Sequence, residues 1–433
     1  MGKWYLAPLA LAVHMYALNR TDKKALSILV FAVAFNALVL HWTSIYVGSM
    51  PWLILTFGLS LLYLPLMLIK RWGIASYPLL FVISEEIRNR FPFGGFGWAR
   101  VAYSQPDAPY SKVAAYGGAV SLSAIAVLLG LFVYKIFNKS FTPIIISPLL
   151  LLLIPHVITI TGQTNVLMVQ GNVPEYGLDF NSRVTQVFFN HVQETDKALS
   201  KYPKVDFVLW PENAVDIDPF KNKIINSELQ KYDVPLIIGA IVDNNQLLNT
   251  SILWTKNVKD VYVKQHLTPF GEYIPLRTIA TKISPLAQQV DDFSPGKISK
   301  TFSIGNATIA PIICYELIDD SILENAAKNS NIFAVQTNSA TFGRSAESAQ
   351  QLSISRIRAI EHSRNIASVS TTGYSAVINY EGKILQRTSM GTAEHIFASV
   401  PLIQNQSIRD RLGDWALVLT LIWLVFVARR AYK

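Results

Sequence analysis

The chain has 433 residues, of which 51% are hydrophobic and 15% are charged, and its formal net charge is +9. With a mean hydropathy of +0.30, it is too apolar for a soluble protein and too polar for a bundle confined to a membrane. Two parts are therefore expected. The positive charge gathers in short loops between apolar runs, so it needs no nucleic-acid partner. A single cysteine excludes an internal disulfide.

Apolar runs fill the first 162 residues and return at the end of the chain. About 20 residues are needed to cross a bilayer, and the candidate spans are residues 4–18, 25–42, 52–69, 74–89, 113–137, 142–160 and 412–428. Glu85, Glu86 and Arg88 make the fourth run the weakest candidate. We expect a transmembrane helical bundle of about six spans over residues 1–162, and a C-terminal transmembrane helix with a basic tail over residues 411–433.

Basic residues mark the side of the membrane on which each loop lies. They fall at residues 20–24, 70–71, 135–139 and 429–433. These are alternate connections, which predicts that they are cytoplasmic and that residues 163–410 lie outside. The loop 85–112 is also basic although it is assigned outside, so we interpret it as an ordered or re-entrant arm. A cleaved signal peptide is not favoured, because Lys3 is the only early charge and no Ala-x-Ala site follows.

Residues 163–410 change to short strand-like runs separated by turns and helical stretches. The predicted strands are residues 165–170, 206–210, 234–242, 249–254, 260–264, 307–313, 331–336, 366–370 and 375–379. The predicted helices are residues 183–201, 320–327 and 345–364. Strands that alternate with helices favour an α/β domain in which helices cover buried sheets.

Three reactive side chains stand at or near the ends of predicted strands in this domain. Cys314 ends an apolar run, Glu212 follows Trp210-Pro211, and Lys264 ends the strand before Thr-Pro-Phe-Gly-Glu-Tyr. Acyl transfer through a thiol needs a nucleophile, a group that takes and returns its proton, and donors for the oxyanion. Lys264 would lower the pKa of the thiol, and Glu212 would shuttle the proton.

Each of these residues has an ordinary explanation when taken alone. An isolated cysteine in an apolar strand is usually a small buried hydrophobe, a glutamate after Trp-Pro is usually a turn residue, and a lysine after a strand is usually solvated. The three lie about fifty residues apart, so only the fold can bring them together.

The motifs around these residues resemble the nitrilase superfamily, and within it the membrane-embedded apolipoprotein N-acyltransferase family. The resemblance rests on Val-Gln-Gly-Asn-Val-Pro at 169–174, Leu-Trp-Pro-Glu-Asn at 209–213, Lys-Gln-His-Leu-Thr-Pro-Phe-Gly-Glu-Tyr-Ile-Pro at 264–275 and Ile-Cys-Tyr-Glu at 313–316. Further matches lie at 337–343, 356–361 and 371–376. The resemblance implies an αββα sandwich attached to a transmembrane α-helical bundle.

Roles carried over by position complete the candidate site. Cys314 becomes the nucleophile, Glu212 the general base, Lys264 the oxyanion-stabilising amine and Glu272 a supporting carboxylate. The resemblance also implies a substrate pocket, with the backbone N–H of Tyr315 as an oxyanion donor. Its further members are Phe270, Tyr273, Glu316 and Asn338. From the residues alone, Asn338 is more readily explained as a loop anchor.

The family reaction implied by the resemblance is a ping-pong acyl transfer. A phospholipid gives an acyl chain to the cysteine as a thioester, and the chain then passes to the α-amino group of a diacylglyceryl-cysteine at a lipoprotein N-terminus. Membrane lipids are the other expected partners, and we expect a monomer without metal or cofactor. The expected location is a bacterial plasma membrane, crossed several times, with the catalytic domain extracytoplasmic and the C-terminus cytoplasmic.

The chain departs from the family pattern at three places. Seven candidate spans stand where the family has eight, residues 175–180 lack a tryptophan used in substrate handling, and residues 339–342 lack an acid and a tryptophan.

Two other functions stay open. A membrane-tethered amidase or nitrile hydrolase would use water in place of the amine, and a transporter or scaffold would need no such site. Transport would favour more charges inside the apolar runs.

Overall fold

The computed structural model describes residues 2–139, 147–173, 185–257, 259–283, 288 and 290–431. It divides into two compact units, which are described separately: residues 1–44, 49–157 and 407–433 form a helical unit, and residues 45–48 and 158–406 form a sandwich unit. Residues 175–180, the start of the predicted helix 183–201, part of the predicted span 142–160 and Lys433 lie outside the described residues.

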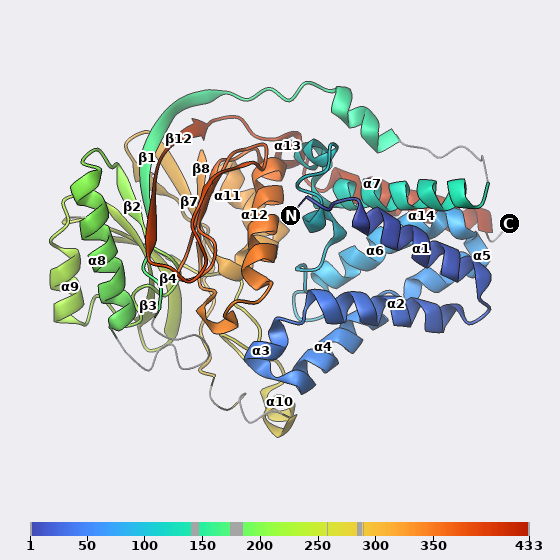
Figure 1. Ribbon diagram of the computed structural model, residues 1–433, viewed down its shortest axis with the longest axis horizontal. Coiled ribbons are helices and arrows are strands. Elements are labelled where there is room, and N and C mark those ends of the chain that lie inside the picture. The colour runs from blue at the N-terminus through green and yellow to red at the C-terminus, as the bar shows by residue number, and fades with distance from the viewer. Residues whose placement is uncertain are drawn as a thin grey trace. The chain divides into compact units, whose positions relative to one another are not determined.

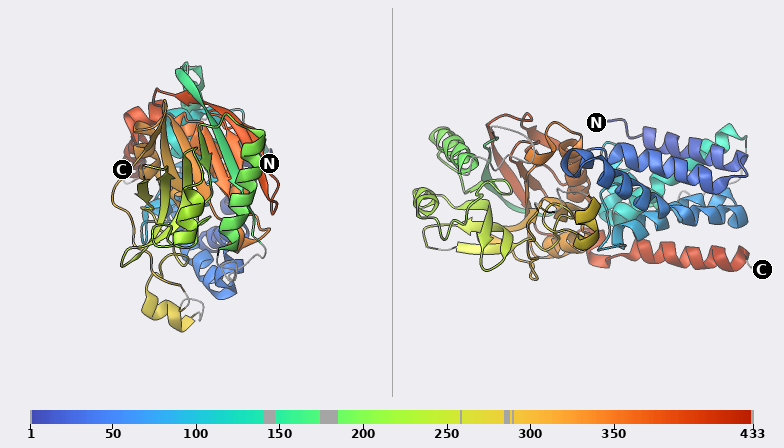
Figure 2. Two further views of the ribbon diagram at one scale, coloured as in Figure 1. Left: turned by 90° about the vertical axis from the view of Figure 1, so that its left-hand side faces the viewer. Right: turned by 90° about the horizontal axis from the view of Figure 1, so that it is seen from below.

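Apolar helices make up the helical unit, where they run alongside one another (Figure 1 and Figure 2). Its α-helices are α1 (Leu6–Arg20), α2 (Lys24–Val39), α4 (Ser49–Leu61), α5 (Ile69–Trp72), α6 (Tyr77–Arg90), α7 (Ala114–Phe137), α13 (Ile408–Leu412) and α14 (Trp415–Ala431), and α3 (Thr43–Val47) lies at the boundary between the units. Short 3-10 helices are η1 (Leu64–Leu68), η2 (Ile74–Ser76), η3 (Val101–Ser104), η4 (Ser111–Val113) and η5 (Ser147–Leu153).

Two helical segments among the described residues are long and apolar enough to cross a membrane. They are Ser49–Trp72 and Ser111–Phe137, and Lys24–Val39 is a shorter apolar helix. The described part of the predicted span 142–160 is not an α-helix. It holds only η5, followed by extended chain, where Pro155 offers no backbone N–H for a continuing helix.

The charges that weaken the fourth apolar run are paired inside the helical unit. Arg88, which is fully buried, lies 3.7 Å from Glu85, and Arg100 Nη2 lies 2.6 Å from Glu86 Oε1. The carboxylate of Glu85 also accepts a hydrogen bond from the backbone N–H of Val101, at 2.7 Å. A buried charge is tolerated when it is paired in this way. The predicted arm, residues 85–112, is therefore ordered. Arg100 and the backbone N–H of Val101 hold it to the glutamates of α6.

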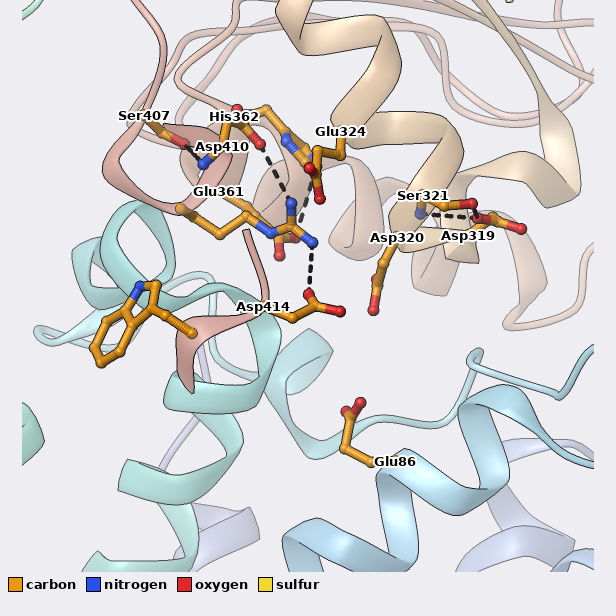
Figure 3. Close-up of polar contacts among 12 residues, drawn as sticks. Glu86, Asp319, Asp320, Ser321, Glu324, Glu361, His362, Ser407, Asp410 and Asp414 are labelled. Atoms are coloured by element: carbon orange, nitrogen blue, oxygen red, sulfur yellow. Dashed lines mark hydrogen bonds and ion pairs between the residues drawn. The ribbon is translucent and has the colours of Figure 1, made fainter. Parts of the chain in front are cut away.

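Polar side chains also fix the turn between α13 and α14. Ser407 caps α13 by accepting a hydrogen bond from the backbone N–H of Asp410 at 3.0 Å (Figure 3), as N-terminal serines commonly do. Arg409 Nη2 lies 3.1 Å from Asp414 Oδ1. These contacts define where the C-terminal apolar helix begins.

Two six-stranded sheets build the sandwich unit. Their orders are β12-β1-β2-β3-β4-β5 and β11-β10-β9-β8-β7-β6. The first sheet contains β1 (Ile160–Gln170), β2 (Phe207–Leu209), β3 (Leu236–Asp243), β4 (Leu247–Trp254), β5 (Lys259–Val263) and β12 (Glu394–Ile403); the second contains β6 (Phe302–Ile304), β7 (Ala307–Ile313), β8 (Ile332–Thr337), β9 (Ile366–Ser370), β10 (Ala376–Ile378) and β11 (Ile384–Arg387). The neighbours β1-β2-β3 and β7-β8-β9 are parallel.

The side chains of β1 alternate between the two faces of the first sheet, and this alternation shows how the layers pack. Val166 and Met168 point into the core between the two sheets, whereas Leu167 and Val169 face the opposite way and pack with residues of α8 (Gln186–Lys201). This is the period of two that a strand buried on both faces requires. Helices α11 (Asp320–Lys328) and α12 (Glu347–His362) cover the second sheet (Figure 1). The order of layers is therefore helix, sheet, sheet, helix.

Candidate active site

The predicted reactive residues lie just beyond the ends of strands in the sandwich unit. Glu212 follows β2 by three residues, Lys264 follows β5 directly, and Cys314 follows β7 directly as the first residue of the 3-10 helix η8 (Cys314–Ile318). Such loop positions on a rigid sheet are where α/β folds place reactive groups. The fold brings all three into one cluster.

Close backbone packing fixes the position of Glu212. A Cβ atom on Gly239 of β3 would lie 2.2 Å from the backbone oxygen of Pro211 and 2.6 Å from the Cα of Glu212, so only glycine permits this approach. The side chain of Gln336, in the second sheet, donates a hydrogen bond to the backbone oxygen of Trp210 at 2.7 Å. The segment that carries the carboxylate is thus held by both sheets.

A buried lysine joins two carboxylates at the centre of the cluster. Lys264, which is 1% exposed, places its Nζ 3.0 Å from Glu212 Oε1 and 2.8 Å from Glu272 Oε2. The Nδ2 of Asn249 in β4 donates to Oε1 of Glu212 at 2.8 Å and also to Oε1 of Glu272. Thr268 accepts a hydrogen bond from Lys264 Nζ at 3.2 Å. Both carboxylates therefore share the same two buried partners, Lys264 and Asn249.

Electrostatics keep Lys264 charged. Burial by itself lowers the pKa of this amine, but the charges of Glu212 and Glu272 outweigh it and raise the pKa well above its usual range. A permanent ammonium in a water-poor site is suited to stabilising an oxyanion, because its field is screened little there.

Cys314 adopts a backbone conformation that favours glycine. Its φ is +48°, a left-handed value that costs on the order of 1–3 kcal/mol in a non-glycine residue and is often found at active sites. The residue is half-buried, and Gln351 Nε2 lies 3.5 Å from its Sγ. Burial raises the pKa of the thiol well above its usual range; the charge of Glu212 raises it further, and Lys264 lowers it. The lysine acts in the expected direction but does not prevail, so the resting group is a thiol.

The carboxylate of Glu316 is engaged by the fold around the cysteine. It accepts hydrogen bonds from the backbone N–H of Ile313 at 2.7 Å, from that of Gln265 at 2.6 Å and from the hydroxyl of Tyr262 at 2.7 Å. Burial raises its pKa to about 7, against these hydrogen bonds and Lys264, which lower it. Glu316 thus ties the turn that carries Cys314 to the end of β5.

The remaining predicted pocket residues lie in the turns beside this cluster. Tyr315 packs its ring edge-on against His266, with centroids 5.2 Å apart. Phe270 has a φ of +64° and donates its backbone N–H to the backbone oxygen of Tyr273 at 2.7 Å. Asn338 accepts a hydrogen bond from the backbone N–H of Ala340 at 3.1 Å, which is the loop anchor that the residues alone indicated.

Helix α11 begins beside these turns. Asp319 caps it, accepting a hydrogen bond from the backbone N–H of Ser321 at 2.9 Å (Figure 3). Asp319 also lies 2.8 Å from His266 Nδ1. The turn after Cys314 is therefore fixed at both of its ends.

Three polar residues of the cluster have no part in the sequence-based site. Asn249 bridges the two carboxylates, Gln351 contacts the thiol, and Glu347 is buried at the start of α12. Asn249 could have been found as an amide inside an apolar strand, which needs a buried partner. Glu347 and Gln351 give no such signal, because they read as ordinary residues of a helix.

Within the described ranges, no group of three or more His, Cys, Asp or Glu side chains is arranged to hold a metal ion. Residues 175–180, where the family pattern has a tryptophan, lie outside them.

Comparison with known proteins identifies both parts of the chain. Residues 1–132 match the family model described as apolipoprotein N-acyltransferase N-terminal domain, and residues 168–410 match the carbon-nitrogen hydrolase model. An apolipoprotein N-acyltransferase from Mycolicibacterium smegmatis is 32% identical over 90% of this chain and 75% of its own length. One from Geobacter metallireducens is 27% identical over 95% of this chain and 89% of its own.

Solved structures are similar over somewhat more than half of the chain, at low identity. Saccharomyces cerevisiae Nit3, a member of the nitrilase superfamily, is 17% identical with a TM-score of 0.42, over 56% of this chain and 91% of its own. A Nesterenkonia amidase of the same superfamily is 15% identical with a TM-score of 0.44, over 60% and 98%. The layered sheets and the carbon-nitrogen hydrolase match confirm the predicted nitrilase-like α/β fold. On the strength of these matches, the chain belongs to the apolipoprotein N-acyltransferase family and is an acyltransferase.

Proposed function

We propose that this protein transfers an acyl chain from a phospholipid, through a thioester on Cys314, to the α-amino group of a diacylglyceryl-cysteine at a lipoprotein N-terminus. The observation that supports the proposal is the buried cluster in which Glu212 lies 3.0 Å from the Lys264 ammonium and acts electrostatically on the Cys314 thiol. The family name of the relatives supports the lipoprotein acceptor.

The first half-reaction forms the acyl-enzyme. Because the resting group is a thiol, its proton moves to Glu212 as the sulfur attacks the ester carbonyl carbon of the donor. Lys264 and the backbone N–H of Tyr315 stabilise the oxyanion. When the tetrahedral intermediate collapses, the carbon–oxygen bond breaks, and Glu212 gives its proton to the departing lysophospholipid oxygen.

The second half-reaction returns the enzyme to its starting state. The neutral amine of the acceptor attacks the thioester carbonyl, Glu212 takes a proton from the attacking nitrogen, and the carbon–sulfur bond breaks. The same proton then restores the thiol. Glu272 and Asn249 keep Lys264 and Glu212 in place throughout, since both hydrogen-bond to this pair.

Both substrates are lipids, which fits an enzyme of the membrane with apolar helices long enough to cross it.

We infer a multi-pass arrangement with the sandwich unit outside and the C-terminus inside, from the alternation of basic loops. Fusion of alkaline phosphatase or a fluorescent protein to the C-terminus tests this orientation: phosphatase activity there contradicts it. A monomer that needs neither cofactor nor nucleic acid is part of the proposal.

An assay with an amine acceptor distinguishes acyl transfer from hydrolysis. The purified protein is incubated with phospholipid and a synthetic diacylated lipopeptide, and the products are separated by mass. The proposal predicts an N-acylated lipopeptide and one lysophospholipid for each transfer. Release of free fatty acid without any acylated peptide would instead identify the membrane-tethered hydrolase.

A further inference from the structure

A further buried carboxyl group, that of Glu347, interacts electrostatically with the thiol, and the two half-reactions above do not use it. Glu347, at the start of α12, is 2% exposed. Its Oε2 has no hydrogen-bond partner within the described part of the chain. The hydroxyl of Ser339 lies near enough to lower its pKa but is also without a close hydrogen-bond partner there. A buried carboxyl oxygen left unsatisfied costs free energy, so its retention calls for an explanation.

The fold aims this carboxyl group at the reaction centre. Gln351 lies one helical turn after Glu347, so the two side chains share a face of α12, and Gln351 contacts the sulfur of Cys314. Glu347 interacts electrostatically with both Cys314 and Glu212. Arg358, further along the same helix, donates to the backbone oxygen of Leu317 at 2.7 Å. This bond fastens α12 to the turn that carries the nucleophile.

The second half-reaction has a requirement that Glu212 alone does not meet. An α-amino group with a pKa of about 7.7–8.0 arrives mostly as an ammonium ion at neutral pH, and it has no lone pair for attack. One proton must leave before attack and a second during it. Glu212 is committed to the second, and it already contacts Lys264 and Asn249.

We propose that Glu347 is a catalytic residue of the second half-reaction: its carboxylate binds the ammonium group of the acceptor and takes the first proton. The inference rests on the proposed function, because it requires an amine acceptor. The proton passes from nitrogen to Glu347, the free amine attacks the thioester, the second proton passes through Glu212 to the sulfur, and Glu347 finally releases its proton to water.

The charge environment suits this exchange. Burial raises the pKa of Glu347 to about 8, Ser339 lowers it and the charge of Glu212 raises it. Proton transfer between groups of similar pKa is fast and reversible. The ionisable groups that interact with Glu347 are Glu212 from the end of β2 and Cys314 from the end of β7, and Lys264 in turn contacts Glu212 and Glu272.

The test separates the two half-reactions in the full-length protein. Glu347→Gln keeps the size of the side chain but cannot take a proton. Acyl-enzyme formation from phospholipid, measured by the mass of the protein, should proceed at the wild-type rate and shows that the variant is folded. Transfer from the preformed acyl-enzyme to the diacylated lipopeptide should be slow. If the wild-type protein forms no acyl-enzyme, the proposed function fails first, and the two failures are thereby distinguished.

The dependence on pH provides a readout that a structural role would not move. Near pH 8 about half of the acceptor amines are ammonium ions and Glu347 is about half ionised, whereas near pH 10 most amines are uncharged. Glu347→Gln should therefore slow transfer most strongly near pH 8, by several-fold, and the defect should largely disappear near pH 10. At pH 6 Glu347 is itself protonated in the wild type, so the defect should be small there as well. Glu347→Asp, which keeps the carboxyl group, should restore part of the rate near pH 8. Glu228 lies on α9 (Lys223–Leu229) and forms an ion pair with Lys231 after the helix; Glu228→Gln should change neither step.

Three outcomes would overturn the proposal: an equal loss of both half-reactions in Glu347→Gln, a transfer rate equal to that of the wild type at pH 8, or a defect that is the same at pH 8 and pH 10.

Discussion

Replacement of Gly239 by alanine tests whether backbone packing positions the general base. The added Cβ would lie 2.2 Å from the Pro211 oxygen, and Cβ atoms do not approach other atoms within 3.0 Å. The segment that carries Glu212 must therefore recede by at least the difference, 0.8 Å. A shift of that size along the contact would lengthen the 3.0 Å bond between Lys264 and Glu212 beyond hydrogen-bonding distance.

Displacement of a catalytic group by about 1 Å can lower a rate about 100-fold, and overpacking costs about 1–3 kcal/mol of stability. We expect Gly239→Ala to fold with a lower Tm and to form the acyl-enzyme about 100-fold more slowly in a single-turnover assay with labelled phospholipid. Gly58→Ala, where nothing lies within 4 Å of the added Cβ, serves as the control and should form it normally. Acyl-enzyme formation by Gly239→Ala at the wild-type rate would refute the positioning argument.

Three further predictions concern the cluster itself. Cys314→Ala and Cys314→Ser should each abolish acyl transfer while the protein still folds and inserts, and activity retained in the alanine variant would remove the mechanism. Glu212→Gln should slow acyl-enzyme formation by about 10²–10⁴-fold, the usual share of a general base; a normal rate would assign the proton transfer to another group. Glu316 has a folded-state pKa of about 7 against an ordinary 4.5, so the folded state binds more protons between these values. Its contribution to stability is full below pH 4.5 and is lost as pH rises to about 7, at most about 1.4 kcal/mol per pH unit. The Tm of the wild type relative to Glu316→Gln should therefore fall across that window, and a constant difference would contradict the assigned pKa.

Much of the sandwich could be predicted because its strands are buried on one or both faces. The nine predicted strands agree with β1 to β5 and β7 to β10, with the largest differences at strand ends. Missing from the prediction are β6, β11 and β12. β6 and β11 are short, and β11 is mostly exposed. β12 is the partner of β1, and long-range pairing leaves no local signal in the sequence.

The site could be predicted in part, for a different reason. The sequence motifs identified Glu212, Lys264 and Cys314 as site residues. The distances between these residues depend on how the two sheets pack, which a motif does not encode. The left-handed backbone of Cys314 could not be foreseen, since nothing in the sequence demands it of a non-glycine residue. The net shift of the Cys314 thiol pKa could not be predicted either, because it depends on how deeply the sulfur is buried as well as on which charges are near.

The mass of the protein after it is mixed with phospholipid alone tests the central claim most directly. We expect a gain equal to one acyl group, located by fragmentation on the peptide that contains Cys314 and removed by hydroxylamine at neutral pH, as a thioester would be. An unmodified Cys314 under conditions in which lysophospholipid accumulates, or an acyl group on any other residue, would contradict the account.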